Sequence, residues 1–172
     1  MKSSVSAALG VIFAVSAPLA AASLQAQQTQ LDVHGNYVVG TSTHNKSWGG
    51  GVGMQTTFGG KTSPIAISTA PSIDYLKQEN GGPSQTTVSL DLDIQPGGNA
   101  TVVPYAGVSA GANWSGGSGK MWDGAKLGLE TLAGAQFKLG TSGASLKAEE
   151  RFGFVKSQEH TLTTRAGFLV SF

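Results

Sequence analysis

The acidic and histidine residues of the chain offer two arrangements that could carry chemistry. Asp32 and His34 are two positions apart, so in an extended strand their side chains point to the same side. Asp91 and Asp93 repeat this spacing, and the four side chains together would supply oxygen and nitrogen ligands to a metal ion. The sequence offers no fuller ligand set and contains no cysteine. We therefore expect a hydrogen-bonded His34, with no bound metal and no other cofactor.

His44 and His160 form the second arrangement. If the segment around His44 and the last strand lie side by side, these histidines could activate a serine and be oriented by an acid. The serines and the acid near them in the sequence are Ser42, Ser47, Ser157 and Glu159. This is the chemistry of a serine–histidine–acid site, and the two histidines are the candidates for catalysis in this chain.

Strands must position these residues, because apolar and polar side chains alternate along most of the chain. Residues 85–95 show a strict period of two, which no amphipathic helix gives. Seven further segments alternate in the same way and are separated by turns rich in glycine, asparagine or proline: 31–42, 47–58, 64–78, 101–114, 125–138, 144–156 and 160–172. Pro71, inside the third segment, predicts a bulge or a weakly paired position. The sequence thus predicts eight strands.

The composition indicates an exported, sparsely charged protein. Residues 1–22 have the layout of a secretory signal peptide, with cleavage after Ala22 or as late as Ala26. A membrane anchor is the alternative, but Pro18 interrupts the apolar run. Residues 23–172 then form one domain. Charged residues are only 12 % of the chain, about half the usual share. The net charge of +1 gives no reason to expect a nucleic-acid partner.

The alternation fits two kinds of barrel. A soluble, lipocalin-like barrel would enclose its aliphatic side chains around a ligand and leave its charges in water. A membrane barrel would do the reverse, and its aromatic side chains would gather at the two lipid–water interfaces. The low charge content and the apolar last strand favour the membrane barrel. The aromatic residues expected at the interfaces are Trp48, Tyr75, Trp114 and Trp122 at one rim and Phe58, Phe137 and Phe172 at the other.

Two short motifs resemble the small eight-stranded bacterial outer-membrane β-barrels, of OmpA-barrel, OmpX and opacity-protein type. One is the ending Phe168-x-Val170-x-Phe172, and the other is the segment 146–152, LKAEERF. The resemblance covers the whole mature chain and implies an antiparallel up-and-down transmembrane barrel. Glu150 departs from the family pattern, which has an aromatic residue there. A lipid-facing carboxylate is costly, so we expect either a bulge or a different register at Glu150.

The resemblance also implies where the protein acts and what it contacts. It predicts a monomer in the lipid bilayer of the bacterial outer membrane, inserted by machinery that reads the assembly signal Phe168, Val170 and Phe172. Small outer-membrane barrels include lipid A deacylases and palmitoyltransferases. This chain has no His-x-Ser segment of the deacylase kind and its predicted outer loops are short, so we expect a structural or surface-interaction role and no enzymatic activity.

An eight-stranded barrel is just wide enough for its own side chains. The inward-facing charges of both signs are therefore expected to pair, because an unpaired buried charge is expensive. The predicted lumen plug consists of Glu130, Glu149, Arg151 and Arg165. A small gated pore is the alternative to a closed plug.

Overall fold

The computed structural model describes residues 26–42, 44–59, 63–116, 125–155 and 160–172. The predicted signal peptide, residues 1–22, lies outside these ranges. So do three residues that the sequence singled out, namely Trp122, Ser157 and Glu159.

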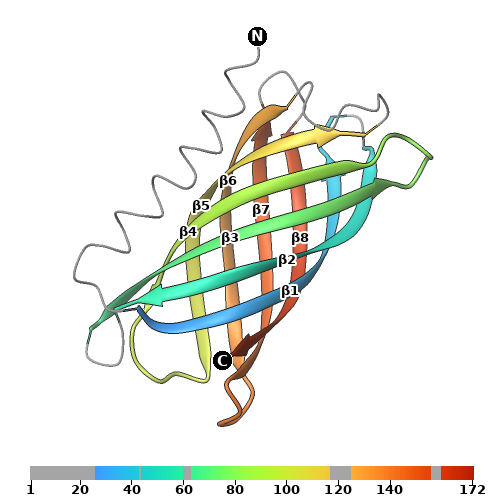
Figure 1. Cartoon of the computed structure of the whole chain (residues 1–172). Coiled ribbons are helices and arrows are strands. Elements are labelled where there is room, and N and C mark those ends of the chain that lie inside the picture. The colour runs from blue at the N-terminus through green and yellow to red at the C-terminus, as the bar shows by residue number, and fades with distance from the viewer. Residues whose placement is uncertain (1–25, 43, 60–62, 117–124, 156–159) are drawn as a thin grey trace.

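Eight antiparallel strands close into one barrel (Figure 1). Each strand pairs with the next along the chain, and the first pairs with the last. The strands are β1 (Ala26–Gly40), β2 (Lys46–Phe58), β3 (Ile65–Gln78), β4 (Gln85–Pro96), β5 (Val102–Ser115), β6 (Lys126–Lys138), β7 (Ala144–Val155) and β8 (His160–Ser171). The predicted fold class and strand number are confirmed. Strand β1 begins at Ala26 and not at Leu31, because its first residues pair with the end of β2. In the described part of the chain, no helix is long and apolar enough to cross a bilayer.

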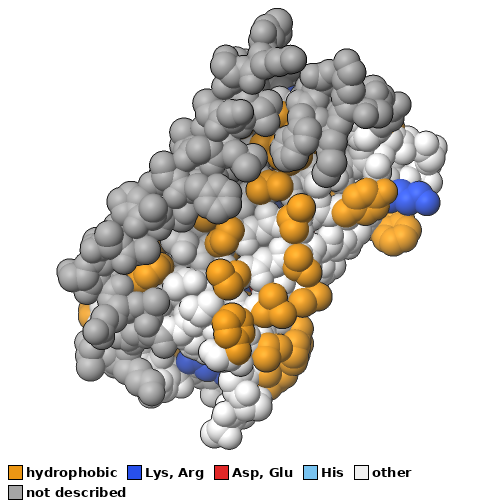
Figure 2. Space-filling view, in the orientation of Figure 1, with side chains coloured by type: hydrophobic (Ala, Val, Ile, Leu, Met, Phe, Trp, Pro, Cys, Tyr) orange, Lys and Arg blue, Asp and Glu red, His pale blue; other side chains and the backbone are white. Residues whose placement is uncertain are grey.

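The barrel is polar inside and apolar outside. Strand β3 shows this plainly, since its residues alternate between buried and exposed along most of its length. The buried set of the described barrel is dominated by polar and charged side chains, whereas most leucine, isoleucine, valine and phenylalanine side chains are exposed. Figure 2 shows hydrophobic side chains spread over one outer face. The soluble lipocalin-like alternative is therefore wrong, because it requires the aliphatic side chains to lie within the barrel.

Pro71 interrupts the pairing of β3 with β2 without shifting it. The β2–β3 ladder has the same register at Gly53–Ser72 and at Thr56–Thr69, on either side of the interruption. On its other edge Pro71 lies opposite Leu90 in a continuous ladder with β4. Proline has no N–H to donate, so the prediction of a weakly paired position is confirmed and the bulge is absent.

Glu150 also lies in an unbroken ladder, and the expectation of a bulge or a changed register there is wrong. It pairs with Ala133 of β6 and with Thr164 of β8, in register with the residues on both sides. Its side chain is exposed on the outer face, where the Thr164 hydroxyl donates a hydrogen bond of 2.8 Å to Oε1. The buried neighbours Glu149 and Arg151 fix the register of β7 and leave Glu150 facing outward.

Candidate functional site: a charge network in the lumen

Inward-facing residues of seven strands, all except β2, meet in the middle of the barrel. Strict alternation places a charged side chain inward at every second position of the central part of β7, where Lys147, Glu149 and Arg151 follow one another. All three are buried, and besides one another they contact acidic side chains on β1, β4 and β6. The network therefore joins segments that are far apart in the sequence.

Arg151 connects three acidic side chains. Its guanidinium group binds the carboxylates of Asp91 on β4 and Glu149 on its own strand. Nη1 also lies 3.2 Å from Oε2 of Glu130 on β6. Arginine presents several N–H donors in one plane, so a single side chain can serve several carboxylates at once. Arg151 is 1 % exposed, so its charge is shielded from bulk solvent and depends on these carboxylates.

Arg165 on β8 binds a second group of acceptors. Its Nη2 lies 3.2 Å from Oδ2 of Asp74 on β3, and its Nε donates a 2.9 Å hydrogen bond to Oδ1 of Asn36 on β1. Longer ion pairs reach Asp91 at 3.8 Å and Glu149 at 3.9 Å. Arg151 and Arg165 thus share two carboxylates, and the two groups of ion pairs form one network.

His34 lies between two carboxylates and does not approach Asp91 or Asp93. Its Nδ1 is 3.1 Å from Asp32 and its Nε2 is 2.7 Å from Asp74. Gly51 on β2 allows this approach, since a Cβ there would collide with both His34 Nε2 and Asp74 Oδ1. In the described residues no group of three or more histidine or acidic side chains is placed to hold a metal. Both nitrogens of His34 are occupied by hydrogen bonds.

Lys147 and Tyr105 complete the surroundings of Glu149. The Tyr105 hydroxyl on β5 donates a 2.8 Å hydrogen bond to Oε2 of Glu149. Lys147 Nζ lies 3.3 Å from the same oxygen and 3.6 Å from Asp32. The Tyr105 ring fits because Gly134 on β6 has no side chain, and a Cβ there would collide with the ring. Both oxygens of Glu149 are therefore served, Oε1 by Arg151 and Oε2 by Tyr105 and Lys147.

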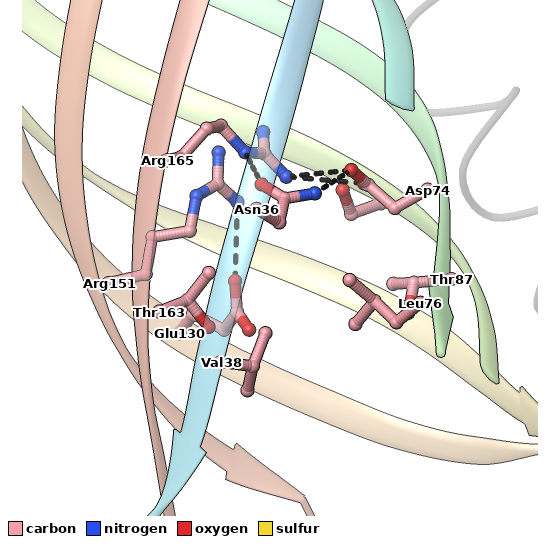
Figure 3. Close-up of a pocket in the computed structure, with 10 residues that line it drawn as sticks. Asn36, Val38, Asp74, Leu76, Thr87, Glu130, Arg151, Thr163 and Arg165 are labelled. Carbon is pink, nitrogen blue, oxygen red and sulfur yellow. Dashed lines mark hydrogen bonds and ion pairs between the residues drawn. The ribbon is translucent and has the colours of Figure 1, made fainter. Parts of the chain in front are cut away.

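A small cavity lies beside Arg151 and Arg165, on the side of the loops opposite the C-terminus. Its volume is about 40 Å³, and Asn36, Asp74 and Glu130 line it beside the two arginines. Figure 3 shows Asn36 between Arg165 and Asp74, and Glu130 directed toward Arg151. A space of this volume holds roughly three water molecules and is far below the several hundred Å³ of small-molecule pockets.

The structure brings Glu130, Glu149, Arg151 and Arg165 into contact through the ion pairs described above. Seven further residues belong to the network but were not among the predicted plug residues: Asp32, His34, Asn36, Asp74, Asp91, Tyr105 and Lys147. All seven lie on the inward faces that alternation identifies. The sequence does not reveal which of these faces meet across the lumen.

The two candidate catalytic histidines occupy different environments. His44 is exposed in the β1–β2 turn, where its φ is 56°. The ring of His160 stacks on Phe152 and meets Phe154 edge-on. The closure of the barrel brings the two segments together through the backbone, since the Thr41 N–H donates to the His160 carbonyl oxygen at 2.9 Å. Ser47, in contrast, is buried on the inward face of β2.

The aromatic residues expected at the interfaces lie near the ends of strands. Trp48 and Tyr75 are exposed toward the end of the barrel that carries the β1–β2 turn. Phe137 and Phe172 are exposed toward the opposite end, where Phe58 is half-buried. Trp114 differs from the others, because it is only 7 % exposed at the end of β5.

The residues of the expected assembly signal share one face of β8. Phe168 and Val170 are exposed on the outer surface, and Phe172 is 84 % exposed just after the strand. The same strand pairs with β1 on one edge and with β7 on the other.

The fold is shared with known outer-membrane barrels. Neisserial surface protein A aligns with a TM-score of 0.59 and 15 % identity, over 84 % of this chain and 97 % of that protein. The outer membrane enzyme PagL aligns with a TM-score of 0.55 and 11 % identity, over 82 % and 99 % of the two chains. A de novo designed transmembrane β-barrel gives 0.52 and 15 %, over 86 % and 98 %.

No protein-family profile and no characterised protein matches this sequence. The resemblance to the small eight-stranded outer-membrane barrels is therefore confirmed at the level of the fold. One of the similar structures is an enzyme and another is a designed protein, so the shared fold by itself assigns no activity.

Proposed function

We propose that this protein resides in the bacterial outer membrane as a monomeric barrel with a closed lumen. Its role is structural or involves interactions at the cell surface, and it carries no enzymatic activity. The observation that supports this is the inverted distribution of side chains. A ring of apolar side chains faces outward, while the buried ion pairs of Arg151 and Arg165 cross the lumen. Such a barrel is stable in lipid, where no sheet edge can remain open.

The first experiment tests the membrane barrel. The mature chain is refolded into detergent or lipid vesicles, and unheated and boiled samples are compared on a denaturing gel. A shift of the band on boiling, with β-type circular dichroism in detergent, is the expected result. A soluble monomer that forms without any amphiphile would contradict the proposal.

The second experiment tests the closed lumen. Arg151 binds carboxylates on β4, β6 and β7, so its ion pairs span much of the lumen's width. We expect no stable single-channel conductance in planar lipid bilayers at moderate voltage. Steady conductance steps in the wild-type protein would favour the alternative of a small gated pore.

The proposal of a non-enzymatic role has its own test. The His160 ring packs against phenylalanines on the outer face, whereas Ser47 faces the lumen, and this separation supports the absence of a serine–histidine pair there. Lipid A from cells that produce the protein is compared by mass spectrometry with lipid A from cells that lack it. We expect identical lipid A species in both samples. The proposal would be overturned if lipid A lost or gained an acyl chain in cells with the wild-type protein but not in cells with His160→Ala.

Export and insertion complete the proposal. We propose that residues 1–22 are removed as a signal peptide and that the insertion machinery reads Phe168, Val170 and Phe172. Amino-terminal sequencing of the membrane-bound protein checks the cleavage point. Phe172→Ser should lower the amount of heat-modifiable protein in the outer membrane, while Ser171→Thr, on the neighbouring position, should leave it unchanged.

A further inference from the structure

The buried charges of the lumen do not balance. The cations among the buried side chains are Lys147, Arg151 and Arg165, and His34 makes four when it is protonated. The buried carboxylates are more numerous: Asp32, Asp74, Asp91, Asp93 and Glu149. Among the described residues, one buried negative charge is therefore left over even with His34 charged.

Asp93 is the carboxylate that the network leaves out. The other four each lie within 4 Å of a nitrogen of His34, Lys147, Arg151 or Arg165, but no ion pair between described residues includes Asp93. Its side chain is 2 % exposed, and Oδ1 has no hydrogen-bond partner in the described part of the chain. It lies against the backbone of Gly107, which brings no side-chain donor. An isolated buried carboxylate is strongly disfavoured, so it must either take up a proton or acquire a positive partner.

Two further acceptor oxygens in the same part of the barrel also lack donors. Oε1 of Gln95, two positions along the inward face of β4, and Oε1 of Gln55 on β2 are buried without a hydrogen bond among the described residues. Ser68 lies directly opposite Asp93 in the β3–β4 ladder, and its hydroxyl group interacts with Gln55 and Thr57. The residues that carry one carboxylate, two amides and one hydroxyl therefore lie on the neighbouring strands β2, β3 and β4, in the half of the barrel that holds the C-terminus.

The chemistry of these four side chains indicates which kind of ion they would bind. All the atoms that could bind a metal here are oxygens, which suit hard cations and not the transition metals that prefer nitrogen or sulfur. Of the four side chains, only Asp93 carries a charge. The excess among the described buried side chains is a single negative charge when His34 is protonated, so a monovalent cation balances it. Mg²⁺ keeps several waters in an octahedral shell and does not fit a narrow lumen of this kind.

We propose that the lumen binds one small monovalent metal cation, of the sodium type, at Asp93, with oxygens of Gln55, Gln95 and Ser68 as further ligands. The cation balances the carboxylate that the arginine network leaves unpaired. Asp93 does not line the cavity beside Arg151 and Arg165, so the cation site is separate from it. Cation binding is a property beyond the proposed structural role.

The test measures binding and stability together. Full-length mature protein, refolded into detergent, is equilibrated with ²²Na⁺ and freed of unbound ion. Its thermal midpoint is then followed in sodium chloride and in N-methyl-D-glucamine chloride at equal ionic strength and pH. We expect about one sodium ion per chain and a saturable rise of several degrees in sodium, because a ligand that binds only the folded state stabilises it.

Variants locate the site. Asp93→Asn should abolish both sodium binding and the sodium-dependent rise. In N-methyl-D-glucamine it should be at least as stable as the wild type, because it removes the unbalanced charge. Glu79→Gln removes an exposed carboxylate in the β3–β4 turn and should behave as the wild type. If Asp93→Asn fails to fold, Gln95→Ala should still fold and bind sodium several-fold more weakly.

Two results would overturn the proposal. One is sodium binding that survives in Asp93→Asn. The other is a wild-type thermal midpoint that is equal in both salts and changes only with pH, which would mean that Asp93 is neutralised by a proton.

Discussion

Glu149 and Glu150 are identical in chemistry and adjacent in the chain, but they lie in opposite environments. Glu149 points into the lumen, where Tyr105, Lys147 and Arg151 surround its carboxylate. Glu150 points outward and interacts with the single hydroxyl of Thr164. In this barrel the lumen provides hydrogen bonds and ion pairs to charged groups, whereas the apolar outer face suits contact with lipid. A carboxylate is therefore stabilising in one position and a burden in the next.

The largest effect should come from removing the cation that serves the inner carboxylates. Arg151→Met leaves Asp91 and Glu149 without a main partner, and loss of one member of a buried ion pair costs about 3–5 kcal/mol. Equilibrium unfolding in urea, with the protein in lipid vesicles, measures the loss. Lys46→Met, at the exposed start of β2, serves as the control and should change stability by less than about 0.5 kcal/mol. A small effect of Arg151→Met would mean that the carboxylates find other partners.

A smaller loss is expected from the hydroxyl that faces Glu149. Tyr105→Phe keeps the ring beside Gly134 and removes one hydrogen bond to a charged group, which is worth about 1.5–3 kcal/mol. The same unfolding experiment measures it. In the double variant Tyr105→Phe, Glu149→Ala the total loss should be smaller than the sum of the two single losses, because both substitutions remove the hydrogen bond between Tyr105 and Glu149.

Glu150 should respond with the opposite sign. Glu150→Leu replaces a lipid-facing carboxylate by an apolar side chain and should stabilise the barrel by about 1–2 kcal/mol, below the 2–4 kcal/mol known for lysine or arginine at the bilayer centre. The reverse control, Glu150→Arg, should destabilise the protein. A loss of stability in Glu150→Leu would show that the carboxylate has a partner that lies outside the barrel.

The smallest effect is expected at Thr164. Thr164→Val removes the hydroxyl that donates to Glu150 but adds apolar surface toward lipid, and we expect the two changes to cancel within about 0.5 kcal/mol. Combined with Glu150→Leu, the valine should become stabilising, because no acceptor then remains.

The sequence predicted the fold well because the period of two is strict. It placed Glu149 and Arg151 on the inward face and Leu146 and Phe152 on the outward face, as the structure has them. It could not predict which strands meet across the lumen, since this depends on strand tilt and register. The contacts of Arg151 with Asp91 and of Arg165 with Asp74 are therefore not readable from the pattern.

The expectation for Glu150 failed for a related reason. The energetic cost of one lipid-facing carboxylate was taken as large enough to shift the ladder. A shift by one residue would move every side chain of β7 to the wrong face, including the buried Lys147 and Arg151, so the single exposed glutamate is the cheaper solution.

The pairing of β1 with β8 has a consequence for biogenesis. Gly35 lies opposite Ala166, so the final seam joins segments separated by most of the chain. Such distant contacts form slowly, because a long loop must close before they contribute any stability. Until β8 arrives, one edge of β1 exposes unpaired backbone groups that invite aggregation. Pairing of β8 with β1 is therefore the step that removes the last open edge of the sheet.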